Sequence, residues 1–149
     1  MNDIRTIVAA TDLSPSGAEV LRTAKGLADR FGARVEVVHV VFDLRKLMGF
    51  FVSDRPLGEM QASLEQEATS GLRKQVRDVF GDAEVGATTR KGTPYGDLVR
   101  HVEEVGGDLL VVGAHGAEKP EHRVYGSTVE RLVKESPCPV LVIGQDGAR

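Results

Sequence analysis

Short apolar runs alternate along the chain with longer segments whose apolar residues recur at helical spacing. Four runs are apolar on both faces, which is typical of strands buried in a parallel sheet. A fifth run alternates and predicts a strand at a sheet edge, with one wetter face. The four buried runs are residues 7–10, 35–41, 108–113 and 140–143, and the alternating run is residues 85–89.

The first helix is expected directly after the first strand. Pro15 suits a first helical position, because its missing N–H would have no partner there. That choice makes Ser14 the cap, whereas Ser16 with Glu19 has the spacing of a capping box, so both starts remain open. Gly32 is expected to end this helix in the left-handed conformation.

Three more helices complete the predicted pattern. The apolar stripe from Met60 to Val79 predicts a helix whose stripe faces the core, and Thr93-Pro94 opens the next helix. Gly126-Ser127-Thr128 opens a short last helix. Residues 42–56 fit either a loop or a short helix over the sheet edge.

Strands that alternate with helices require right-handed crossovers, which give a mainly parallel sheet covered on both faces. The 149 residues fit one domain, 1–149, without an internal repeat or a dividing linker. Hydrophobic residues make up 41% and charged residues 28%, close to the average for a globular protein. We therefore predict a single doubly wound α/β domain.

Charge and composition exclude several classes of function. The net charge of −3 gives no electrostatic footprint for nucleic acid. The single cysteine cannot form an internal disulfide, no secretory leader is recognisable, and no apolar stretch approaches the ~20 residues of a membrane helix. We expect a cytoplasmic protein with neither a membrane nor a nucleic-acid partner.

Ligands of open α/β sheets bind beyond the carboxyl ends of the strands, where the winding direction reverses. There the loops 11–14 and 113–116 would face each other, with residues 126–128 closing the second loop. A glycine at 116 allows a positive φ or a close approach to a ligand, and the start of the last helix offers free N–H groups and two hydroxyls to an anion. This is a candidate phosphate site, although neither a Walker A loop nor a dinucleotide fingerprint is present.

By themselves, glycines and serines at these positions are equally explained as turn and capping residues. Their spacing favours binding, because Gly113-x2-Gly116-x9-Gly126-Ser127 resembles the nucleotide-binding signature of the universal stress protein family. The resemblance extends from Ile4 to Ile143. The matching segments, in order, are Ala10–Ser14, Val38–Val41 and Pro137–Ile143.

The resemblance implies a five-stranded parallel sheet of order 3-2-1-4-5, ATP binding, and homodimers joined through the last strand, Val140 to Ile143. Such a dimer would also cover the unpaired backbone groups of an edge strand. By the same resemblance, Asp12 would contact the ribose, Thr11 would line the adenine pocket, and backbone groups of Val40 would meet the adenine edge.

The resemblance also implies the residues around the phosphates, with Mg²⁺ held on the phosphate oxygens. Gly113, His115 and Gly116 would flank the ribose and the α-phosphate, and the β- and γ-phosphates would lie at Gly126, Ser127 and Thr128. The loop 117–125 departs from the family, since it contains two glutamates and no glycine. The two carboxylates would repel a triphosphate by about 1 kcal/mol in partly solvated surroundings, which Lys119 and Arg123 could offset.

The leading hypothesis is an ATP-binding stress-response regulator that acts through nucleotide-dependent partner contacts. One alternative is a slow ATP hydrolase or phosphotransferase that uses Asp12 or His115. Another is a nucleotide-free interaction or chaperone-like module. Two further residues have structural interpretations: His39 as a satisfied histidine of a strand or its end, and Cys138 as a structural thiol between two prolines.

Overall fold

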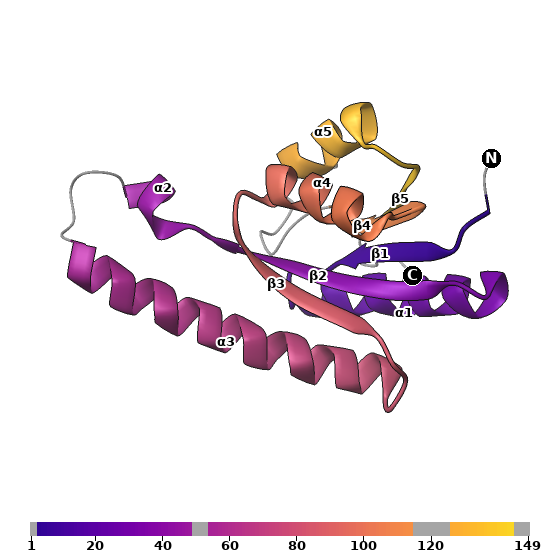
Figure 1. Ribbon diagram of the computed structural model, residues 1–149, viewed down its shortest axis with the longest axis horizontal. Coiled ribbons are helices and arrows are strands. Elements are labelled where there is room, and N and C mark those ends of the chain that lie inside the picture. The colour runs from indigo at the N-terminus through magenta and orange to yellow at the C-terminus, as the bar shows by residue number, and fades with distance from the viewer. Residues whose placement is uncertain (1–2, 49–53, 115–125, 145–149) are drawn as a thin grey trace.

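A parallel β-sheet forms the centre of the fold in the computed structural model, which describes residues 3–48, 54–114 and 126–144 (Figure 1). In these ranges the sheet has five strands in the spatial order β3-β2-β1-β4-β5, as predicted. All four strand pairs are parallel. The strands are β1 (Thr6–Ala10), β2 (Arg34–Phe42), β3 (Gly86–Gly92), β4 (Leu109–Gly113) and β5 (Val140–Ile143).

Helices cover both faces of the sheet. Their side chains show that α1 (Pro15–Phe31) and α3 (Asp54–Phe80) pack on one face, and that α4 (Pro94–Val105) and α5 (Ser127–Glu135) pack on the other. A short helix, α2 (Leu44–Met48), follows β2. No helix in the described ranges has the length and apolarity needed to cross a bilayer.

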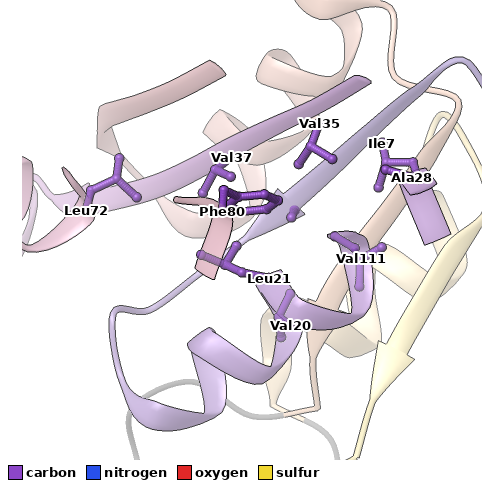
Figure 2. Close-up of a cluster of buried hydrophobic side chains, with 11 residues drawn as sticks. Ile7, Val20, Leu21, Ala28, Val35, Val37, Leu72, Phe80 and Val111 are labelled. Atoms are coloured by element: carbon purple, nitrogen blue, oxygen red, sulfur yellow. The ribbon is translucent and has the colours of Figure 1, made fainter. Parts of the chain in front are cut away.

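Two hydrophobic cores lie on opposite sides of the sheet, because successive strand residues point to opposite faces. Ile7 and Val37 belong to the core under α1 and α3, where Figure 2 shows Val37 beside Phe80 of α3 and Ile7 beside Ala28 of α1. Val8 and Val38, their neighbours in sequence, belong to the core under α4 and α5. This burial on both faces explains why the strands appear as nearly continuous apolar runs.

The ends of α1 are fixed by local hydrogen bonding. Ser14 is the N-cap, and its hydroxyl accepts a hydrogen bond from the Gly17 N–H at 3.2 Å, which decides between the two possible starts. Gly32 ends the helix with φ 65°, the left-handed conformation predicted for it.

The helix predicted around the stripe Met60–Val79 is longer than expected, and the first two residues of the stripe lie outside the core. Its stripe is buried at Ala68 and Leu72, but Met60 and Leu64 are 50% and 38% exposed. Figure 1 shows the reason: the first turns of α3 extend past the body of the sheet, beside α2. The prediction that the whole stripe faces the core is therefore wrong for its first two members.

The edge strand β5 uses only every other residue to bind β4. The carbonyls of Pro139 and Ile143 accept hydrogen bonds from β4 and the residue after it. Because parallel strands direct alternate residues to the same neighbour, Val140 and Val142 direct their backbone groups away from β4. This outer edge is the one predicted to pair with a second copy.

Candidate functional site

The winding direction reverses between β1 and β4, which are hydrogen-bonded neighbours. The chain leaves β1 for α1 on one face, whereas α5, the helix preceding β5, lies on the opposite face. The loop after β1 and the start of α5 therefore border a crevice at the carboxyl ends of the strands. This is where the sequence predicted the ligand.

Hydrogen bonds hold the start of α5 against the ends of β4 and β5. The Gly126 N–H donates to the Ala114 carbonyl at 3.0 Å, and the Ala114 N–H donates to the Ile143 carbonyl at 2.9 Å. Gly126 is the N-cap, and among the residues that the structure describes no side chain bonds to the first turn at this cap. The first N–H groups of a helix have no partner within it, so they remain available to an anion. Ser127 is exposed and Thr128 half-buried beside them.

Asp12 lies on the opposite side of the crevice with one carboxylate oxygen paired and the other unpaired. Its Oδ1 accepts hydrogen bonds from the Ser14 N–H at 3.0 Å and from the Ser14 hydroxyl. Its Oδ2 is buried and has no partner among the described residues. Because an unpartnered buried acceptor costs about 1–3 kcal/mol, a donor supplied by a ligand would stabilise this arrangement.

Thr11, the other residue predicted on this loop, is turned toward α3. Its side chain is buried, and its hydroxyl donates to Oε1 of Gln75 and accepts from the Leu13 N–H. Nδ1 of His39 lies 2.8 Å from the Thr11 carbonyl, which confirms that this histidine is satisfied within the protein. The role of Thr11 in an adenine pocket stays a prediction.

Leu13 has a strained backbone. Its φ of 68° is the one positive value among the non-glycine residues that the structure describes. This conformation costs about 1–2 kcal/mol in a residue with a Cβ. The Gln75 side chain also donates to the Ser14 carbonyl at 3.0 Å, and each such hydrogen bond contributes about 1 kcal/mol, enough together to offset the strain.

The backbone of Val40 points past the end of β1 into the crevice. Arg34 and Val38 of β2 are both hydrogen-bonded to the β1 side, to Arg5 and Thr11. Val40 is the next residue in this alternation, and β1 ends at Ala10, opposite Val38. The position fits the predicted contact between Val40 and an adenine edge, which is untested.

Gly17 brings the start of α1 close to the loop after β1. A Cβ at this position would lie 2.2 Å from Oγ1 of Thr11 and 2.8 Å from Oδ1 of Asp12. Only a glycine allows the helix and the loop to approach so closely.

Two of the predicted site residues, His115 and Gly116, lie outside the described residues, as does the loop 117–125. Gln75, by contrast, bonds to the loop at the crevice and was not predicted. A signal for it exists in the sequence, because Gln75 occurs at helical spacing from the apolar residues Ala68 and Leu72.

A separate polar cluster lies between β3 and α4. Arg90 donates to Glu104 at 2.7 Å, and a guanidinium nitrogen of Arg90 lies 3.4 Å from Nδ1 of His101. His101 is only 3% exposed, and burial, followed by the charge of Arg90, lowers its pKa, although Glu36 and Glu104 oppose the shift. Within the ranges described above, no three His, Cys, Asp or Glu side chains are grouped as they would be around a metal ion.

Fold and crevice together define a doubly wound α/β protein with a candidate ligand site at its topological switch point. The sequence model of the universal stress protein family matches residues 3–144. The chain belongs to the universal stress protein family. A universal stress protein of Methanocaldococcus jannaschii is 30% identical over 144 residues, which cover 95% of this chain and 83% of the relative.

Solved structures show the same fold. The universal stress protein UspA from Lactobacillus plantarum has a TM-score of 0.81 at 23% identity, over 96% of this chain and 99% of that chain. A universal stress protein in complex with cAMP has a TM-score of 0.61 at 22% identity, over 96% and 98%. The universal stress protein from Archaeoglobus fulgidus in complex with dAMP has a TM-score of 0.64 at 22% identity, over 96% and 99%.

Proposed function

We propose that the chain binds an adenine nucleotide, ATP, in the crevice between the loop after β1 and the start of α5. The observation that carries this proposal is the buried Oδ2 of Asp12, an acceptor without a described partner at a crevice whose other side is an uncapped helix start. Such a pair suits a ligand that has hydroxyl donors at one end and negative charge at the other. Similar proteins in complex with cAMP and dAMP support the choice of an adenine nucleotide.

In this proposal the nucleoside end lies at the loop after β1. Asp12 accepts a hydrogen bond from a ribose hydroxyl through Oδ2, and Thr11 borders the adenine through its backbone, since its hydroxyl is bound to Gln75. Val40 offers its N–H and C=O to the adenine edge. Gly113, His115 and Gly116 flank the ribose and the α-phosphate.

The phosphate end lies at the first turn of α5, where Gly126, Ser127 and Thr128 offer N–H groups and two hydroxyls to the β- and γ-phosphates. Mg²⁺ would be held mainly by the phosphate oxygens, because the described residues offer only isolated oxygen ligands at this end of the crevice, such as the hydroxyl of Ser127. A bound metal ion would lower the charge that the start of α5 must balance.

In this proposal the chain is a stress-response regulator, and its contacts with partner proteins depend on the bound nucleotide. We also propose that two copies pair through the outer edge of β5, where Val140 and Val142 direct backbone groups away from β4. The location of the protein in the cytoplasm stays a prediction.

Calorimetric titration of ATP with Mg²⁺ into the wild type and into Asp12→Asn tests the site. The substitution removes the charge of an acceptor proposed to bind a ribose hydroxyl, so we expect affinity to fall about tenfold or more. Asp43→Asn is the matched control, because Oδ1 of Asp43 accepts a hydrogen bond from the Arg45 N–H at 3.0 Å, the same short-range pattern, at the start of α2. Its affinity should equal that of the wild type.

The same titrations distinguish the alternatives. If the wild type binds no nucleotide, the proposal is refuted and a nucleotide-free interaction module is favoured. Equal affinity in Asp12→Asn and Asp43→Asn would mean that the site is placed wrongly. Repeated ATP turnover that disappears in Asp12→Asn would instead identify a hydrolase.

A further inference from the structure

We propose that Gln75, near the carboxyl end of α3, is a positioning residue of the nucleotide site. It holds the loop Thr11–Ser14 in the conformation that keeps Oδ2 of Asp12 free for a ligand. This inference rests on the function proposed above and adds a helix that is remote in sequence, 61 residues from Ser14, to the site.

The Gln75 amide spans the loop and bonds to both of its ends. Nε2 donates to the Ser14 carbonyl at 3.0 Å, and Oε1 accepts from the Thr11 hydroxyl. A carbonyl oxygen can only accept, so the amide nitrogen must face Ser14 and the amide oxygen must face Thr11. The Thr11 hydroxyl then has its proton committed to Gln75, and its lone pairs are free to accept from the Leu13 N–H at 3.0 Å. The Gln75 amide therefore fixes the direction of the hydrogen bond that the Thr11 hydroxyl donates.

The loop needs such support because one of its residues has an unfavourable backbone conformation. Leu13 has a φ of 68°, which side chains with a Cβ rarely adopt. Gly17 brings α1 so close that the Thr11 hydroxyl has little room to rotate. Without Gln75, the Thr11 hydroxyl loses its acceptor and the Ser14 carbonyl keeps only the Ala18 N–H at 3.1 Å. With fewer bonds to offset its strain, Leu13 can relax, and Asp12 moves with it.

His39 holds the same loop at one point only. Its Nδ1 contacts the Thr11 carbonyl at 2.8 Å, before the strained residue. Among the described hydrogen bonds, only Gln75 brings a side chain of another element to the loop beyond Leu13. Gln75, rather than His39, should therefore determine how often Asp12 occupies the binding conformation.

The chain contains a matched control on the same helix. Gln61 also uses both ends of its amide, accepting from the Leu44 N–H at 2.9 Å and donating to the Phe42 carbonyl at 3.1 Å. It fixes the junction of β2 and α2 instead of the loop after β1. Gln66, also on α3, is exposed. Replacing these two glutamines separates general effects on α3 from effects on the site.

The test is to measure the affinities of ATP and AMP, together with the melting temperature, for the wild type, Gln75→Leu, Gln61→Leu and Gln66→Leu. When the competent loop conformation falls to about a tenth of the population, apparent affinity falls about tenfold. We expect this loss in Gln75→Leu, by the same factor for ATP and AMP because the loop meets the nucleoside. Gln61→Leu should melt earlier but keep its affinity within about twofold, and Gln66→Leu should match the wild type in both.

Ser127→Ala should give a different pattern. Loss of the hydroxyl proposed to bind the β- and γ-phosphates should weaken ATP binding and leave AMP binding unchanged. If Gln75→Leu binds both nucleotides as Gln61→Leu does, the positioning role is overturned. An effect of Gln75→Leu on ATP alone would also overturn it, because the loop would then not act on the nucleoside end.

A measurement without nucleotide separates this inference from the proposed function. Amide hydrogen exchange, followed by NMR, reports directly on the N–H groups of Leu13 and Ser14, which bond to Thr11 and Asp12. We expect exchange to accelerate at least about tenfold in Gln75→Leu and to stay unchanged in Gln61→Leu, consistent with the population shift above. Unchanged exchange in Gln75→Leu refutes the role of Gln75 in the loop, whereas accelerated exchange in a chain that binds no nucleotide refutes only the proposed ligand.

Discussion

Two glycines of α1 provide a direct test of how tightly the helix and the loop after β1 are packed. A Cβ at Gly17 would lie 2.2 Å from Oγ1 of Thr11, 2.8 Å from Oδ1 of Asp12 and 3.2 Å from the Asp12 backbone nitrogen. A Cβ at Gly26 would meet nothing within 4 Å. The same substitution, glycine to alanine, should therefore have opposite effects nine residues apart on one helix.

The expected magnitudes follow from three contributions. Alanine is favoured over glycine inside a helix by up to about 1 kcal/mol, so Gly26→Ala should stabilise the protein. Gly17→Ala gains no more than this, loses about 1–3 kcal/mol to overpacking, and about 1 kcal/mol more for each bond of the Thr11 hydroxyl that breaks. The two variants should differ by about 2–4 kcal/mol in the free energy of unfolding.

Urea unfolding and thermal melting both measure this difference. At this chain length about 2 kcal/mol corresponds to at least about 4 °C in melting temperature, which is easily resolved. Equal stability of Gly17→Ala and Gly26→Ala would refute the reasoning, because the loop would then move away without cost. If Gly17→Ala has a normal melting temperature but binds ATP more weakly, the loop has shifted and Asp12 has moved with it.

Two other predictions concern pH and assembly. Below the ordinary histidine pKa of 6.5, folded His101 binds fewer protons than the unfolded chain, so its contribution to stability is complete above that pH and falls as the medium is acidified. Between pH 7.5 and 5.5 the melting temperature should fall less steeply with pH in His101→Gln than in the wild type. An identical dependence of melting temperature on pH would contradict a lowered pKa of His101. Val142→Pro removes an outward N–H of β5 without touching the ladder to β4, so light scattering should find a dimer for the wild type and a folded monomer for the variant. A variant that remains dimeric would place the interface elsewhere.

The parallel, doubly wound sheet could be predicted from the sequence because burial on both faces leaves an apolar run, and crossovers restrict how such runs are connected. The order of its strands came from the family resemblance. The edge position of β3 was equally accessible, since residues 85–89 alternate. The extent of the core could not be predicted from the sequence. Periodicity shows that Met60 and Leu64 share a stripe with Leu72, but it does not show that the sheet beneath α3 ends before its first turns.

The candidate site was predictable only in part. Asp12 and the glycine–serine start of α5 follow from their places at strand and helix ends, and their family spacing adds to this. The interaction of Gln75 with the loop depends on a contact between residues far apart in sequence, which neither local pattern nor spacing contains. The choice between Ser14 and Ser16 as helix cap likewise required the geometry of the loop.

The two bonded glutamines of α3 restrict how this helix can change in length. Gln61 and Gln75 are separated by nearly four helical turns, about 21 Å along the axis, and each reaches a different loop from the same side of the helix. Inserting one residue between them would rotate one amide by about 100° relative to the other and break its contacts. Insertions or deletions between these residues should therefore be tolerated only near whole multiples of the helical repeat, so α3 sets the spacing between the loop after β1 and the junction of β2 and α2.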